Sequence, residues 1–109
     1  MIALIGTGYW GSKILATLNN MDIAVKQFDI KDNINNIKEE NIIIATPAET
    51  HFELAQHIIT QGKNVLVEKP AFMSMKECLA IENSLKSKFM AGHILLYSEH
   101  FDLIKQRIM

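Results

Sequence analysis

The chain has 109 residues, of which 49% are apolar, and this predicts one domain, 1–109, with a hydrophobic core of its own. Its net charge of −1, with both signs interspersed, gives no basic patch for nucleic acid and no basic amphipathic run for a membrane surface, and its apolar stretches are too short to cross a bilayer. Because the single cysteine, Cys78, has no partner for an internal disulfide and Met1 leads directly into an apolar run, we expect a cytoplasmic protein without a signal peptide.

The first eleven residues join a short apolar run to a glycine-rich turn. Residues 2–5 read Ile-Ala-Leu-Ile, a run typical of a buried strand, and residues 6–11 read Gly-Thr-Gly-Tyr-Trp-Gly. In this G-x-G-x-x-G pattern Gly6 permits a sharp turn, Gly8 lets a pyrophosphate approach the main chain, and Gly11 lets the next helix pack closely on the strand. The N–H groups at the start of that helix then face the phosphates. Glycines also serve any tight strand-to-helix turn, so the pattern alone is weak evidence.

The rest of the chain alternates expected strands and helices. In chain order these are a helix at 10–18, a strand at 23–28 nearer an edge, a polar connection at 30–41 with at most a short helix, a strand at 42–46, a helix after Thr50, a strand at 64–67, a helix after Ser74, a strand at 89–92, an extended segment at 93–97 and a helix at 98–109. Nearly continuous apolar strands that alternate with helices predict an α/β fold with a doubly wound parallel sheet of about five strands.

Sequence signals mark the starts and the apolar faces of the later helices. Thr50 with Glu53, and Ser74 with Glu77, each form the pattern of a capping box. The second of these helices is expected to line its inner face with Cys78, Leu79, Ile81 and Leu85. In the last helix Phe101, Ile104 and Ile108 share a face with Tyr97.

Asp29 ends the second expected strand, roughly twenty residues beyond the glycine turn, where a dinucleotide-binding fold needs an acid. A carboxylate there accepts both hydroxyls of the adenosine ribose and repels a 2′-phosphate, which favours NAD over NADP. Lys31, two residues on, softens that discrimination. The alternative interpretation is a solvated aspartate that caps a turn.

Unusual polar residues follow three other strands. Thr46-Pro47, Glu68-Lys69-Pro70 and Gly92-His93 all stand at carboxyl ends of strands, the edge at which open parallel sheets bind ligands. We expect Lys69, held by the following proline, to bind a carbonyl or hydroxyl oxygen through its charge. A solvated loop lysine is the alternative.

The remaining histidines and Cys78 give no metal or nucleophile pattern. His51 and His57 lie six residues apart on one expected helix and so face different ways. We expect His51 to help shape the cofactor loop, His57 to be on the surface, and His93 to reach the cofactor from its strand end. Cys78 falls on an apolar face and is more typical of a core residue than of a nucleophile.

Three segments together resemble the N-terminal half of the glucose–fructose oxidoreductase / inositol dehydrogenase (Gfo/Idh/MocA) family. They are the turn 6–11, the stretch Ala45-Thr46-Pro47 followed by His51, and Gly62-Lys63-Asn64-Val65-Leu66-Val67-Glu68-Lys69-Pro70. The last is the most specific, and the resemblance covers essentially the whole chain. It implies a Rossmann-type domain of an NAD(P)-dependent oxidoreductase that acts on a sugar, polyol or sugar nucleotide by hydride transfer.

The resemblance also implies roles for individual residues. Lys69 takes the position of the lysine that contacts both the nicotinamide side and the substrate hydroxyl, which makes it the candidate catalytic residue. The cofactor-binding candidates are Gly6, Gly8, Tyr9, Trp10, Gly11, Asp29, Thr46, Pro47, His51, Glu68, Lys69 and His93; no metal ligand is expected.

The chain departs from that family after Tyr97. Ser98-Glu99 replaces the expected His-Pro, and the large substrate domain that follows in family members is absent from the 109 residues. Since hydride transfer needs a positioned substrate carbon and a base in reach, we expect an incomplete catalyst. A separate chain carrying a substrate domain is one candidate partner, and a second copy bound through Phe101, Ile104 and Ile108 is another.

Two other functions fit parts of the pattern. The first is a non-catalytic regulatory or partner-binding module that responds to NAD, although such a module has no reason to keep Glu68-Lys69-Pro70. The second is an S-adenosylmethionine-dependent methyltransferase, whose glycine turn and strand-end acid look alike. The short chain and the Glu-Lys-Pro sequence argue against the methyltransferase.

Overall fold

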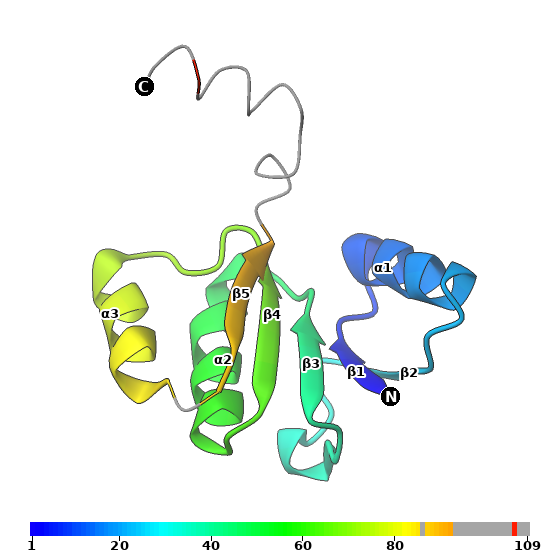
Figure 1. The fold of residues 1–109 in the computed structure, drawn as a ribbon, viewed down its shortest axis with the longest axis horizontal. Coiled ribbons are helices and arrows are strands. Elements are labelled where there is room, and N and C mark those ends of the chain that lie inside the picture. The colour runs from blue at the N-terminus through cyan, green and yellow to red at the C-terminus, as the bar shows by residue number, and fades with distance from the viewer. Residues whose placement is uncertain (86, 93–105, 107–109) are drawn as a thin grey trace.

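The computed structural model describes residues 1–85, 87–92 and 106, and it contains one five-stranded parallel sheet in the order β2-β1-β3-β4-β5 (Figure 1). The strands are β1 (Ile2–Ile5), β2 (Val25–Phe28), β3 (Asn41–Ile44), β4 (Asn64–Glu68) and β5 (Phe89–Gly92). The helices are α1 (Tyr9–Asn20), α2 (His51–Thr60) and α3 (Met75–Ser84), with 3₁₀ turns at Ile34–Asn36 and Ala48–Thr50. The predicted α/β fold of Rossmann type, with five strands, is confirmed.

The helices divide between the two faces of the sheet. α2 packs on β3 and β4 and against α3, whereas α1 packs on β1 and β2 (Figure 1). Side chains alternate along each strand, so the face under α2 receives Ile42 and Ile44 of β3 while Ile43 points to the other face. The main buried cluster lies under α2 and comprises Ala3, Ile5, Phe28, Ile37, Ile42, Ile44, Ala55, Ile58, Ile59, Val65, Val67 and Ile81.

The connection between β2 and β3 contains no full helix, as its polar sequence predicts. β2 lies at the edge of the sheet, and only the 3₁₀ turn Ile34–Asn36 interrupts the chain between β2 and β3. Ile37 anchors this connection in the core, where it is 4% exposed. A full crossover helix is therefore replaced by one buried isoleucine and a single turn.

Parallel strands place all their carboxyl ends at one edge, which we call the carboxyl rim, and all their amino ends at the amino rim. The amino rim is tied together by side chains. Asn64 donates from Nδ2 to Oδ1 of Asn41 (2.9 Å), and its own Oδ1 accepts from the N–H of Lys88 (3.0 Å). Lys63 Nζ donates to the carbonyl of Ile37 (2.5 Å). These bonds connect β3, β4 and β5 with the segment that leads into β3.

Both helices begin directly after the predicted cap residue, but only one of the two predicted capping boxes is confirmed. Ser74 caps α3, because its hydroxyl oxygen accepts from the N–H of Glu77 (3.2 Å). Thr50 makes no cap bond to α2. A 3₁₀ turn runs into α2 at this point, and the Thr50 hydroxyl instead donates to the Pro47 carbonyl (2.6 Å) and contacts the Thr46 hydroxyl (2.7 Å).

The predicted apolar face of α3 is only partly buried. Ile81 is 2% exposed, but Cys78 and Leu79 are exposed, so the expectation that Cys78 belongs to the core is wrong. α3 packs against α2 at the end of the sheet, and this leaves one narrow line of contact instead of a broad face. The expected elements at 93–97 and 98–109 lie outside the described residues, apart from Gln106.

Candidate functional site

The glycine turn connects β1 to α1 at the carboxyl rim, and its three glycines have different surroundings. Gly6 has φ +134°, and a Cβ there would lie 2.4 Å from the carbonyl oxygen of Ala45. A Cβ on Gly11 would lie 2.4 Å from the carbonyl oxygen of Gly6, so α1 and β1 approach too closely for any side chain. A Cβ on Gly8 would meet nothing within 4 Å. Gly6 and Gly11 are thus required by packing, whereas Gly8 opens the main chain to a ligand.

The N-terminus of α1 fits an anion. Gly8 precedes the helix and brings no side chain to cap it, and the first N–H groups of a helix have no partner within the helix. They carry the positive end of the helix dipole. From β2, Gln27 Nε2 donates to the carbonyl of Gly6 (2.8 Å) and fixes the turn. Nothing in the sequence pattern of β2 distinguishes Gln27, so its contact with Gly6 was not predicted.

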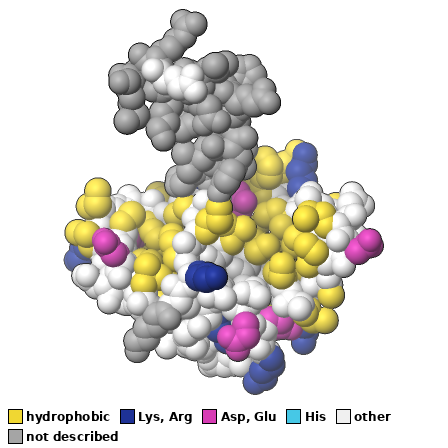
Figure 2. All heavy atoms as spheres, in the orientation of Figure 1, with side chains coloured by type: hydrophobic (Ala, Val, Ile, Leu, Met, Phe, Trp, Pro, Cys, Tyr) yellow, Lys and Arg dark blue, Asp and Glu magenta, His cyan; other side chains and the backbone are white. Residues whose placement is uncertain are grey.

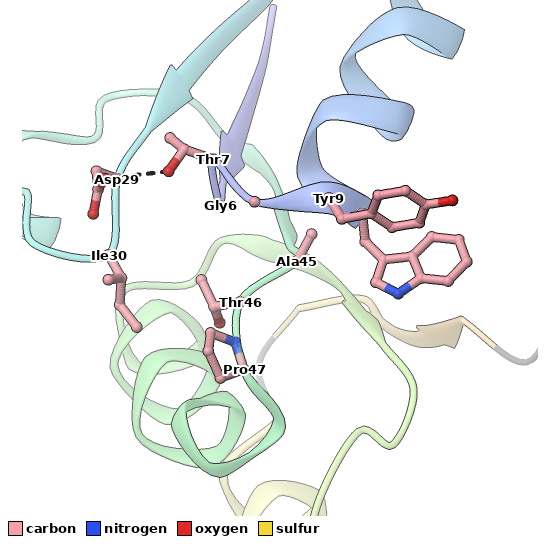
Figure 3. Close-up of a pocket in the computed structure, with 10 residues that line it drawn as sticks. Gly6, Thr7, Tyr9, Asp29, Ile30, Ala45, Thr46 and Pro47 are labelled. Carbon is pink, nitrogen blue, oxygen red and sulfur yellow. Dashed lines mark hydrogen bonds between the residues drawn. The ribbon is translucent and has the colours of Figure 1, made fainter.

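Asp29 follows β2 directly and faces the turn (Figure 3). Its Oδ1 accepts from the N–H of Lys31 (3.0 Å) and its Oδ2 from the hydroxyl of Thr7 (3.2 Å). The N–H of Lys31, foremost, lowers the pKa of Asp29 from its ordinary value; desolvation opposes this, and the Thr7 hydroxyl adds to the lowering. The carboxylate is therefore held ionised and in a fixed orientation.

These parts enclose one side of a hollow of about 320 Å³ (Figure 3). Its lining residues are Gly6, Thr7, Gly8, Tyr9, Trp10, Asp29, Ile30, Ala45, Thr46 and Pro47. Seven of the predicted cofactor-binding residues are among them, with Gly11 behind the turn. Thr7, Ile30 and Ala45 were missed, although each is a direct neighbour of a predicted residue in the chain.

Tyr9, from the glycine turn, lies at the far end of this hollow from Asp29 (Figure 3). The rings of Tyr9 and Trp10 meet edge to face, with centroids 5.2 Å apart, and the Lys13 Nζ lies 4.7 Å from the Tyr9 ring. The two side chains are 67% and 61% exposed. They offer flat apolar surface and one positive charge at the rim.

A second hollow of about 440 Å³ adjoins the first, since Trp10, Ala45 and Thr46 line both. Glu68, Lys69 and Gly92 line this second hollow and not the first. Lys69 therefore stands next to the end of the first hollow that lies away from Asp29. The last predicted cofactor residue, His93, lies outside the described residues.

His51 lies behind the rim instead of lining either hollow. It is 1% exposed, and its ring connects the ends of two strands. Nδ1 lies 2.8 Å from the carbonyl oxygen of Pro70, after β4, and Nε2 lies 2.8 Å from that of Thr46, after β3. His51 thus joins the wall of the first hollow to the turn that carries Lys69, a role its place in the sequence did not reveal.

Within residues 1–85, 87–92 and 106, no three His, Cys, Asp or Glu side chains are grouped to hold a metal ion. No helix among these residues is both long and apolar enough to cross a membrane.

Comparison with known proteins agrees with this geometry. A family model described as an oxidoreductase family with an NAD-binding Rossmann fold (Gfo/Idh/MocA) matches residues 20–93. The matched range begins after the glycine turn, so the evidence for that turn is structural. Among known proteins, an uncharacterized oxidoreductase of Streptococcus pneumoniae serotype 4 is 30% identical over 84% of this chain and 31% of its own length.

Two other proteins extend the comparison. Inositol 2-dehydrogenase of Rhizobium meliloti is 29% identical over 62% of this chain and 21% of its own length. The crystal structure of GenD2 from gentamicin A biosynthesis, in complex with NAD, superposes with a TM-score of 0.73 at 19% identity, over 97% of this chain and 38% of GenD2. At that identity the likeness concerns the fold alone.

This chain therefore spans less than a third of the length of these two sequence relatives. Its five-stranded parallel sheet, the turn at Gly6–Gly11 and the match over residues 20–93 lead to one conclusion. The chain belongs to the Gfo/Idh/MocA oxidoreductase family and contains its NAD-binding Rossmann domain.

Proposed function

We propose that this chain is the cofactor-binding part of an oxidoreductase that moves a hydride between NAD and a hydroxyl-bearing carbon of a sugar, polyol or sugar nucleotide. The observation that carries the proposal is the pair of adjoining hollows, with Asp29 at one end and Lys69 beyond the other. The kinship with inositol 2-dehydrogenase supports the substrate class. When bound, NAD supplies or accepts the hydride.

Each end of the paired hollows has a separate task in this proposal. The open main chain at Gly8 and the N-terminus of α1 hold the pyrophosphate. Asp29, ionised and oriented by Thr7 and the N–H of Lys31, accepts the ribose hydroxyls and repels a 2′-phosphate. This charge selects NAD over NADP.

Lys69 acts at the other end. Its ammonium group holds the substrate oxygen whose charge changes during hydride transfer, and it stabilises negative charge on that oxygen. His51 fixes the main chain on both sides, at Thr46 and at Pro70. A base for the substrate proton and a surface that orients the substrate carbon come from a substrate domain beyond these residues. The chain alone should therefore bind NAD and turn over simple polyols at a negligible rate.

Calorimetric titration of the purified chain with NAD, and then NADP, tests the binding proposal. Gly8→Val fills the open space at the turn, so the fold is retained while the pyrophosphate loses its place. We expect NAD to bind more tightly than NADP and Gly8→Val to abolish both. The thermal midpoint of the variant is the control for folding. Absence of binding in the parent chain contradicts the proposal.

Lys69→Ala separates the oxidoreductase from an NAD-responsive regulatory module. We expect the variant to bind NAD nearly as the parent does, because Lys69 does not line the first hollow. Hydride transfer reconstituted with a substrate domain should be lost. A regulatory module would show no function that depends on Lys69.

A further inference from the structure

A third hollow, of about 260 Å³, lies between α2 and the connection from β2 to β3. Its lining residues are Ile30, Ile34, Thr50, Glu53, Leu54 and His57. α2 lies behind the sheet in the view of Figure 1, and Figure 2 shows the opposite side, where hydrophobic side chains gather. The third hollow shares only Ile30 with the first hollow and no residue with the second.

Ile30 places the third hollow at the Asp29 end of the first. It follows Asp29 directly, lines both hollows, and its side chain points away from the glycine turn (Figure 3). The second hollow adjoins the first at Trp10 instead. In a dinucleotide the base is joined to the ribose carbon next to the one that carries the 2′-hydroxyl. A ribose held by Asp29 therefore directs its base toward the third hollow.

Apolar side chains from two segments form walls of the third hollow. Ile30 and Ile34 come from the connection after β2, and Leu54 comes from α2. Ile34 begins the 3₁₀ turn of this short connection, and the turn lies beside α2, with Asn35 Oδ1 3.1 Å from His57 Nε2. Ile34 and Leu54 are partly buried, and both pack against the main buried cluster. Apolar walls with a few polar groups among them are typical of a site for a flat aromatic ring.

Of the polar side chains that line the third hollow, Glu53 alone has no partner in the described part of the chain. The Thr50 hydroxyl donates to the Pro47 carbonyl (2.6 Å), and His57 Nε2 contacts Asn35. The Glu53 carboxylate makes no hydrogen bond or ion pair with a described residue. An ionised carboxylate accepts hydrogen bonds and donates none. The third hollow therefore fits a ligand that brings a donor.

We propose that Glu53 selects the base of the dinucleotide by accepting a hydrogen bond from the exocyclic amino group of adenine. That amino group is a donor, and a hydrogen bond to a charged acceptor is stronger than a neutral one. Hypoxanthine carries a carbonyl oxygen in place of the amino group, and the Glu53 carboxylate repels it. The inference rests on the proposed function, since it takes the ligand of the first hollow to be a dinucleotide.

A glutamate in the first turn of a helix also interacts favourably with the helix dipole. That interaction stabilises α2 whatever base is present, so it does not discriminate between dinucleotides. Glu49, in the 3₁₀ turn that leads into α2, is exposed and lines none of the three hollows. It carries the same charge at the same helix start and is therefore the matched control for Glu53.

The ratio of two dissociation constants tests the proposal. The parent chain, Glu53→Gln and Glu49→Gln are each titrated calorimetrically with NAD and with nicotinamide hypoxanthine dinucleotide, which differs from NAD only in the base. We expect the parent and Glu49→Gln to bind NAD roughly 3- to 10-fold more tightly than the hypoxanthine compound, the range for one net hydrogen bond. In Glu53→Gln the ratio should fall to about one, because an amide accepts from an amine and also donates to a carbonyl oxygen.

Two results would overturn base selection by Glu53 while leaving the proposed function in place. Equal affinity of the parent for both dinucleotides would mean that the third hollow does not distinguish the base. An unchanged ratio in Glu53→Gln would mean that another group does so. If the parent binds neither dinucleotide, the proposed function fails as well, so the two failures are distinguishable. Both constants come from the same sample, and a lower folded fraction in a variant therefore cancels in the ratio.

Discussion

Asp29 is a carboxylate whose charge state is set by the two residues that contact it. The N–H of Lys31 and the hydroxyl of Thr7 favour the ionised form, and the pKa lies below its ordinary value. A lowered pKa means that the carboxylate stays ionised to a lower pH than an ordinary aspartate and loses its charge as the pH falls through the lowered value. Any binding that requires this charge therefore persists into mildly acidic solution.

The first prediction concerns this charge. We expect the affinity for NAD to stay constant from neutral pH down to about pH 5, the upper limit of ordinary aspartate titration. Asp29→Asn should weaken NAD binding roughly 10- to 100-fold, the range for a lost hydrogen bond to a charged group, and should narrow the preference for NAD over NADP. Titration calorimetry at several pH values measures both. An unchanged NAD-to-NADP ratio in Asp29→Asn would show that the carboxylate does not select the cofactor.

His51 is a residue whose importance lies in its two main-chain contacts. His51→Leu replaces the ring by an apolar side chain of similar size and removes both ring contacts to the carbonyl oxygens of Thr46 and Pro70. We expect the free energy of unfolding to fall by about 1–3 kcal/mol or more. His57→Leu is the matched control on the same helix, since His57 is exposed, and should change it by less than about 0.5 kcal/mol. Urea denaturation compares the two, and equal values would contradict the assignment.

At the scale of elements, the starts of α2 and α3 differ although their sequences look alike. Both have a hydroxyl residue three positions before a glutamate, but only Ser74 accepts the N–H of the third following residue. At α3, Glu77 Oε1 reaches back to the N–H of Met73 (2.9 Å) and completes the cap. At α2 the 3₁₀ turn Ala48–Thr50 leads directly into the helix, and the Thr50 hydroxyl donates to the Pro47 carbonyl instead of accepting from the helix.

This difference predicts the effect of substitutions at α3. Ser74→Ala should lower the free energy of unfolding by about 1 kcal/mol, because the first N–H groups of the helix lose their acceptor. Ser74→Asp, which keeps an acceptor at the cap, should restore most of it. Thermal unfolding of the three proteins is the measurement. If Ser74→Ala unfolded at the same temperature as the parent, the cap would contribute nothing to stability.

The elements predicted from sequence were those with continuous apolar runs. The apolar runs predict strands at 42–46 and 64–67, and the structure has β3 at Asn41–Ile44 and β4 at Asn64–Glu68. The faces of helices were harder to predict. Cys78 and Leu79 fit an apolar stripe by spacing, yet both are exposed, because among the described helices and strands α3 packs mainly against α2. The spacing of apolar residues predicts which side chains share one side of a helix, but not whether another element packs against that side.

The whole molecule has an uneven core. The main buried cluster lies between the sheet and α2, and Ile58 at its centre is 0% exposed. On the face of the sheet that α1 covers, Ile14 and Leu18 of α1 are only partly buried, and both line the second hollow. Most of the hydrophobic stabilisation of the described residues therefore comes from one side of the sheet.

Ile58→Ala should consequently cost about 2–5 kcal/mol of the free energy of unfolding, as for other fully buried aliphatic residues. The same change at Ile14 should cost clearly less, because its side chain leaves no closed cavity. Urea denaturation of both variants gives the comparison. Equal costs would mean that the face of α1 is as fully packed as the face of α2.

The parts of the site that could be predicted from the sequence are the glycine turn and the acid at the end of a strand. Gly6, Gly8 and Asp29 were found because glycines and a strand-end acid have fixed places in the sequence of such a fold. Gln27 and the links of His51 were not found, since a polar residue in an edge strand or at a helix start has many possible partners. Only the positions of β2, β3 and β4 in space decide which partner it has.

The tied amino rim has a consequence for how such a domain can change. Asn41, Lys63, Asn64 and Lys88 fasten one end of the sheet by specific side-chain bonds, so altering the chain there disrupts the scaffold. The loops of the carboxyl rim instead carry residues that line the first and second hollows. Loops exchanged at that end would give the domain new ligands while leaving its foldability intact. Its evolvability is concentrated at one end of the sheet because the other end is fixed.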